Sequence, residues 1–87
     1  NNRDMKFTDR NIDEIQGIFA DNEVSVTSSY VSQYDDLELV VENNLFLSFE
    51  EFQGSCRAAC DDCINLGNAR DWDILSINED VATVALY

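Results

Sequence analysis

The sequence predicts a single α+β domain, 1–87, in which two helices pack on one face of an antiparallel sheet of four to five strands. Two segments carry apolar residues at helical spacing behind N-terminal capping signals, and the other apolar segments alternate as strands do. Their order along the chain is αββ-(β)-αββ. Helices with one apolar stripe each can cover one face of a sheet, which gives a two-layer domain.

The first helix is expected to begin after Thr8 and to end near Ala20. The Thr8 hydroxyl can cap the first turn, and Phe7 before it can pack against Ile12 as a hydrophobic staple. The inward stripe of this helix consists of Ile12, Ile15, Ile18 and Phe19. Residues 1–6 are expected to form a loose N-terminal lead-in.

Two strands follow the first helix. The first is expected from Val24 to Tyr34, where one parity contains Val24, Val26, Tyr30 and Tyr34. Asp35 and Asp36 form a turn, and Leu37 to Glu42 form the second strand, with Glu38 facing outward. Asn43-Asn44 can adopt the positive φ values of a tight turn, so residues 45–47 are the optional extra strand.

The second helix, Ser48 to Gly67, has the clearest boundaries in the chain. Ser48 and Glu51 form a capping box, and Gly67 is a suitable C-terminal stop. One narrow stripe contains Phe49, Phe52, Cys56, Cys60 and Cys63. Carboxylates gather on the side away from it: Glu50, Glu51, Asp61 and Asp62.

The spacing Cys56-x3-Cys60-x2-Cys63 is also found in the cluster-binding loop of radical-SAM enzymes, and it could form part of a zinc site. A tetrahedral zinc site requires four ligands, and the chain has no histidine and no fourth cysteine. We therefore expect small, buried apolar residues and no cofactor or metal. An odd number of cysteines on one helix face favours free thiols and a reducing, cytoplasmic compartment.

The last two strands are expected over residues 72–77 and 81–87, with a turn at 78–80. Both parities of this hairpin are apolar, which is typical of strands that are central in a sheet, covered on both faces or used for self-association. Cover by the helices is the expected arrangement, and a homodimer through this hairpin is the alternative.

The net charge of −13, from 18 acidic and five basic residues, is the strongest global feature of the chain. Such a field repels nucleic acid and membrane surfaces and attracts basic partners. The chain has no apolar run long enough to span a membrane. Without histidine, no Ser/His or Cys/His catalytic pair can form, and no glycine-rich phosphate loop is present, so we expect a protein that is not an enzyme.

These features favour a non-enzymatic acidic inhibitor that mimics nucleic-acid phosphates. It would occupy a basic channel of a nucleic-acid-processing complex, as small phage proteins of the anti-CRISPR or anti-restriction type do. It would bind neither nucleic acid nor membranes directly. The main candidate contact residues are Glu50, Glu51, Asp61 and Asp62. The secondary candidates are Asp13, Glu14, Asp35, Asp36, Glu38 and Glu42.

Three other functions fit the same sequence. An immunity-type protein that plugs a toxic nuclease would use aromatic anchors such as Tyr30, Tyr34 or Trp72. A small assembly subunit would associate through the C-terminal hairpin. A metal or cluster protein would use the three cysteines.

Overall fold

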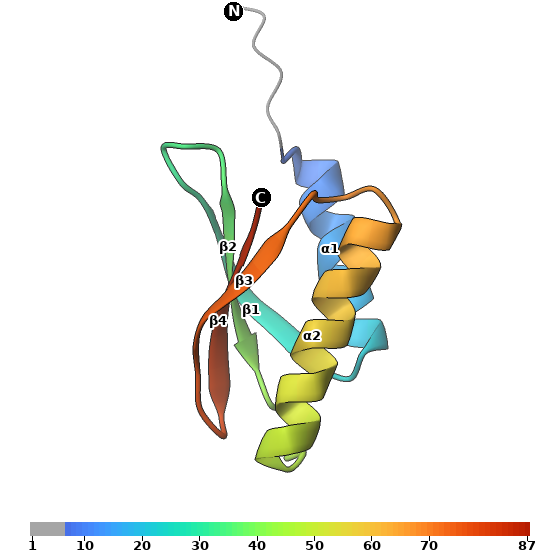
Figure 1. Cartoon of the computed structure of the whole chain (residues 1–87), viewed down its shortest axis with the longest axis vertical. Helices are drawn as coiled ribbons and strands as arrows, with labels where there is room; N and C mark the ends of the chain where they lie inside the picture. Colours follow the sequence, from blue (N-terminus) through green and yellow to red (C-terminus); the bar gives the residue numbers. More distant parts are fainter. Residues whose placement is uncertain (1–6) are drawn as a thin grey trace, which may run out of the picture.

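Both helices begin at the predicted capping residues in the computed structural model, which describes residues 7–87 (Figure 1). Helix α1 spans Asp9–Asp21 behind Thr8, and helix α2 spans Phe49–Asn65 behind Ser48. The Glu51 N–H donates to Ser48 Oγ at 3.2 Å, and the Ser48 N–H donates to Glu51 Oε1 at 3.0 Å. This reciprocal pair is the predicted capping box. The lead-in expected at residues 1–6 lies outside the described residues.

Four antiparallel strands form one sheet in the order β1-β2-β4-β3. Their bounds are β1 Ser25–Val31, β2 Leu37–Glu42, β3 Trp72–Ile77 and β4 Val81–Leu86. Both helices pack against this sheet, which confirms the predicted α+β class and the order αββ-αββ (Figure 1). Strand β1 is shorter than predicted, because its pairing with β2 ends at Val31 opposite Leu37.

The extra strand expected at residues 45–47 is wrong, because this segment is a loop that enters α2. The Asn43 side chain folds the segment back. Its Oδ1 accepts the Leu47 N–H at 2.9 Å, and its Nδ2 donates to the Leu47 carbonyl at 2.8 Å. An amide that bridges both backbone groups of Leu47 replaces the ladder bonds that a strand would make.

A β-bulge in β1 changes which side chains of its second half point toward the inner face of the sheet. The register between β1 and β2 shifts between Val26 and Ser28, so Thr27 is the extra residue. Val26 lies opposite Val41 on the inner face, but Tyr30 lies opposite Glu38 and is 62% exposed. The parity that the sequence suggested for Val24, Val26 and Tyr30 is therefore broken at the bulge.

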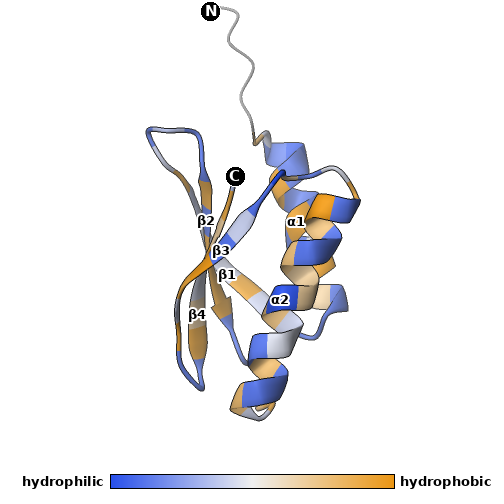
Figure 2. Cartoon of the chain, viewed as in Figure 1, coloured by the Kyte–Doolittle hydropathy of each residue, from blue (hydrophilic) through white to orange (hydrophobic). Residues whose placement is uncertain are grey.

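The core lies between the helices and one face of the sheet (Figure 2). Its fully buried side chains include Phe19 from α1, Phe52 from α2, Leu39 from β2 and Val84 from β4. Strand β4 is central, but both helices lie on the same side of the sheet (Figure 1). The helices therefore cover one face of the C-terminal hairpin, as the predicted two-layer arrangement requires.

Two exposed glycines inside helices weaken the fold. Gly17 and Gly54 have no neighbouring atom within 4 Å of the Cβ that an alanine would add. Because glycine in a helix interior is about 1 kcal/mol less favourable than alanine, we expect Gly17→Ala and Gly54→Ala each to raise the free energy of unfolding by about that amount in urea titrations. Gly67, at φ +80°, is the matched control, and Gly67→Ala should lower stability. A loss of stability in Gly54→Ala would contradict the regular helix at that position.

Candidate acidic docking surface

The four acidic residues of α2 divide between two flanks of the helix. Asp61 turns toward β3, where its Oδ1 accepts the Trp72 Nε1–H at 2.9 Å. Asp62 turns toward α1, where its Oδ2 accepts the Asn22 Nδ2–H at 3.1 Å. Adjacent residues on a helix point about 100° apart, so neighbouring carboxylates reach different elements. The single acidic face that the sequence suggested is therefore two rows of carboxylates.

Glu51 and Glu50 extend these two rows at the N-terminal end of α2. The Glu51 carboxylate is fixed by the capping box, and the hydrogen bonds from Ser48 lower its pKa. Glu50 is exposed in the same first turn. Three of the four main candidates, Glu51, Asp61 and Asp62, thus accept hydrogen bonds that hold their charges in set positions.

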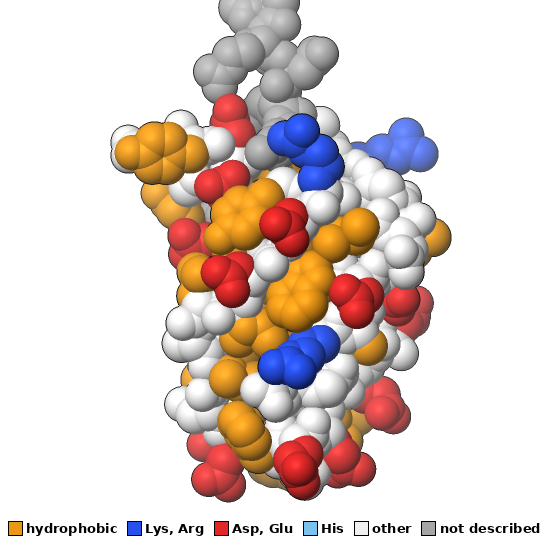
Figure 3. All heavy atoms as spheres, viewed as in Figure 1, with side chains coloured by type: hydrophobic (Ala, Val, Ile, Leu, Met, Phe, Trp, Pro, Cys, Tyr) orange, Lys and Arg blue, Asp and Glu red, His pale blue; other side chains and the backbone are white. Residues whose placement is uncertain are grey.

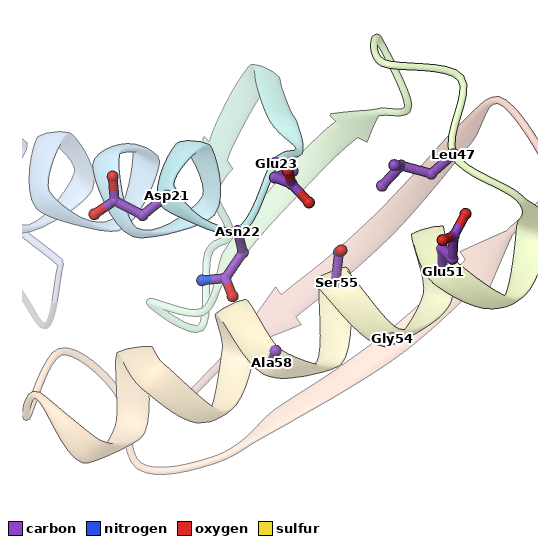
Figure 4. A pocket seen from close by; sticks show the side chains of 8 residues that line it. All are labelled: Asp21, Asn22, Glu23, Leu47, Glu51, Gly54, Ser55 and Ala58. Atoms are coloured by element: carbon purple, nitrogen blue, oxygen red, sulfur yellow. The ribbon is translucent and has the colours of Figure 1, made fainter.

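A hollow lies beside the α1 flank of α2 (Figure 4). The small residues Gly54 and Ala58 form part of its wall. The side chains of Glu51 and Ser55 extend from α2 toward the side where Glu23 and Leu47 lie. The remaining lining residues are Asp21 and Asn22, at the end of α1. Acidic side chains from three segments therefore border a space that could accept a lysine or arginine side chain. Asp21 and Glu23 were not among the sequence candidates.

A second acidic cluster lies on the outer face of the sheet around Tyr87. Glu38 on β2 and Asp73 on β3 both lie opposite Ala85 of β4, so the two carboxylates flank that residue. Burial raises the pKa of Tyr87, and the negative charges of Asp73, Asp36, Asp71 and Glu38 raise it further. The fold thus brings the predicted residues Asp36 and Glu38 close to Asp71 and Asp73, which were not among the sequence candidates. Only knowledge of the strand order could have revealed that pairing.

The other predicted acidic residues lie outside the two rows on α2. Asp13 and Glu14 are exposed on α1, Asp35 lies in the β1–β2 turn at φ 64°, and Glu42 is exposed at the end of β2. Figure 3 shows acidic side chains spread over the visible face among hydrophobic ones, with few basic side chains. The negative charge is therefore spread over α1, the sheet and α2, and on α2 three of the four carboxylates accept hydrogen bonds.

The three cysteines are fully buried and free, which confirms that they are core residues. Burial raises the pKa of Cys56 to about 11 and, with the Asp62 charge, that of Cys63 to about 12. Burial also raises the pKa of Cys60. Across residues 7–87, no group of three or more histidine, cysteine, aspartate or glutamate side chains is placed to hold a metal ion. In the same part of the chain, no helix has the length and apolarity needed to cross a membrane.

Comparisons with protein-family models, with curated proteins and with solved structures find no match for this chain. Fold, charge and side-chain geometry are therefore the basis for a functional proposal.

Proposed function

We propose that this protein is a non-enzymatic inhibitor that mimics nucleic-acid phosphates and occupies a basic channel of a nucleic-acid-processing complex, as anti-CRISPR or anti-restriction proteins do. The observation that supports this most is the net charge of −13 on a fold that fixes carboxylates through its own hydrogen bonds. Carboxylates in set positions can replace phosphates without first being ordered, which lowers the entropic penalty of binding. Its partner is then a cationic protein surface in the cytoplasm.

The length of α2 suits this role. From Glu50 to Asp61 the helix axis rises by about 16 Å at roughly 1.5 Å per residue. Duplex DNA carries about one negative charge per 1.7 Å of axis, so a DNA channel has basic side chains along such a length. The two rows on α2 would meet basic side chains at both ends of this distance. The hollow beside Glu51 and Gly54 would accept one of them.

Self-assembly through a sheet edge has less support. Both edge strands carry a β-bulge, at Thr27 in β1 and at Leu75 in β3. Bulges at sheet edges interrupt the ladder and hinder pairing with a second chain. An immunity-type protein remains the alternative, because it would use the same charged surface against a single nuclease.

Replacing carboxylates by amides of the same shape tests the proposal. In the variant Glu50→Gln, Glu51→Gln, Asp61→Asn and Asp62→Asn, an amide oxygen can still accept each hydrogen bond described above. We expect unchanged unfolding in urea but a loss of roughly 30-fold in affinity for the cationic proteins that the wild type captures from host lysate at 0.15 M salt. This corresponds to about 0.5 kcal/mol for each of four exposed charge pairs.

The outer-face cluster provides a matched comparison. Asp36→Asn, Glu38→Gln, Asp71→Asn and Asp73→Asn remove the same charge from the opposite face of the sheet. Loss of binding in this variant alone would assign docking to the outer face and contradict docking through α2. Equal loss in both variants would mean that only total charge matters. If added duplex DNA displaces the captured protein, phosphate mimicry is favoured over an immunity-type plug.

A further inference from the structure

The loop between β2 and α2, residues 43–48, exposes large apolar side chains. Phe46 is 89% exposed and Leu45 is 57% exposed, and Phe49 in the first turn of α2 is 40% exposed. Scattered apolar residues on a surface need no explanation, but these three lie within five positions of one short segment. We call Leu45, Phe46 and Phe49 the apolar tip.

Asn43 holds this loop against two other parts of the fold. It is 8% exposed, and its side chain makes both hydrogen bonds to Leu47 described above. Its Nδ2 also donates to the Glu79 carbonyl at 2.9 Å, and its backbone N–H donates to the Asp80 carbonyl at 2.9 Å. The loop is therefore tied both to the start of α2 and to the β3–β4 turn. An anchor that is ordered before binding loses less entropy when it binds.

Phe46 has a backbone conformation that disfavours its own side chain. Its φ is +55°, in the left-handed region where glycine and asparagine are far better tolerated than a bulky residue. Burial of the phenyl ring does not offset this strain, because the ring lies almost wholly in solvent. Neither folding nor solubility explains an aromatic residue here, and strain of this kind is concentrated at functional sites.

Acidic residues lie next to the loop that carries the apolar tip. The contacts of Asn43 bring the Glu79-Asp80 turn beside the loop, and Glu50 and Glu51 follow it in the first turn of α2. We propose that the apolar tip inserts into an apolar pocket of a protein partner whose rim carries lysine and arginine. The charge favours this occupant, since two copies of a chain at −13 would place acidic rims together. This proposal rests on the proposed function and adds the apolar tip as the specific anchor of the inhibitor on its partner.

A defined probe can test the chemistry of the pocket without the natural partner. Heptakis-amino-β-cyclodextrin has an apolar cavity with a rim of ammonium groups, and plain β-cyclodextrin has the same cavity without the charge. In NMR titrations of the wild type, we expect shift changes confined to residues 44–50 and at least about tenfold tighter binding of the amino form at low salt. Equal affinity for the two cyclodextrins, or shift changes centred outside residues 44–50, would overturn the proposal that the partner pocket has a basic rim.

Phe46→Asn tests the anchor itself. Asparagine tolerates the left-handed conformation, so this variant should fold at least as well as the wild type. We expect it to lose both the cyclodextrin shifts and roughly 30-fold or more in affinity for the captured cationic protein, as a hot-spot aromatic does. Leu66→Asn is the matched control, because Leu66 is 68% exposed at the other end of α2 and should tolerate the change without loss.

The outcomes separate this inference from the proposed function. If Phe46→Asn binds like the wild type while the four-amide variant of α2 does not, the anchor is overturned and the acidic surface stands. If Phe46→Asn loses binding while the amide variant keeps it, the anchor stands and phosphate mimicry is overturned. If the wild type captures no protein beyond what both variants capture, both proposals are overturned.

Discussion

Raising the pH from 8 to 11 is expected to unfold the protein, because its three buried thiols resist ionisation in the folded state. An unfolded cysteine ionises near pH 8.5, whereas burial raises the pKa of Cys56 to about 11 and that of Cys63 to about 12. Above pH 8.5 the folded state thus binds more protons than the unfolded state. The stability that neutral thiols provide is complete below that pH and is lost as the pH rises toward the folded values.

The size of this effect is comparable to the stability of the whole domain. Each pH unit in which a thiol ionises only on unfolding removes about 1.4 kcal/mol. Between pH 8.5 and 11, Cys56 and Cys63 should each remove about 3 kcal/mol, and Cys60, with its raised pKa, adds to that loss. A domain of this size has a total of only about 5–15 kcal/mol. The net negative charge of the chain also grows as the pH rises, and the resulting self-repulsion lowers the stability of the folded state further.

Circular dichroism and the carbon-13 shifts of the cysteine Cβ atoms, followed together under reducing conditions, would check this prediction. We expect secondary structure and the protonated thiol shifts to be lost in one transition. Cys63→Ala is the control, because it removes one ionising group and should move the midpoint to higher pH. Thiols that ionise near pH 9 while the dichroism stays unchanged would contradict the burial on which the prediction depends.

Local sequence patterns were sufficient to predict the elements of this fold. The Ser48–Glu51 capping box depends on residues three positions apart, and the structure forms it as expected. Strands β2 and β3 begin and end at the predicted residues, because alternating side chains and flanking turns define them within a few positions. Helical spacing also placed Phe52 and the three cysteines on the face of α2 that meets the core, but Phe49 on the same predicted stripe is 40% exposed.

Features that depend on contacts between distant segments could not be predicted. The bulges at Thr27 and Leu75 appear only against the partner strands, and they decide which face Tyr30 presents. A helical wheel gave the directions of Asp61 and Asp62 but not their partners, because Trp72 and Asn22 come from other elements. The outer acidic cluster likewise requires β4 to lie between β2 and β3. The sequence thus located the charge, and only the fold arranged it into rows and clusters.

Asn43→Ala is expected to lower the free energy of unfolding by about 3 kcal/mol, a large effect for one polar side chain. The substitution leaves the Leu47 N–H, the Leu47 carbonyl and the Glu79 carbonyl without the partner that they have in the wild type. Each buried polar group left unsatisfied costs about 1–3 kcal/mol, and water that reaches the loop would offset part of that. Urea unfolding measures the loss.

Asn44→Ala is the matched control, since Asn44 is the exposed neighbour and none of the hydrogen bonds that hold the loop involves its side chain. It should change stability by less than about 0.5 kcal/mol. Amide exchange at Leu47 gives a second measurement, because freeing the loop should speed that exchange more than exchange in the central strand β4. If Asn43→Ala and Asn44→Ala unfold alike and Leu47 stays protected, the loop is ordered without Asn43. The apolar tip would then owe its position to the backbone alone, and Asn43→Ala should leave binding through Phe46 intact.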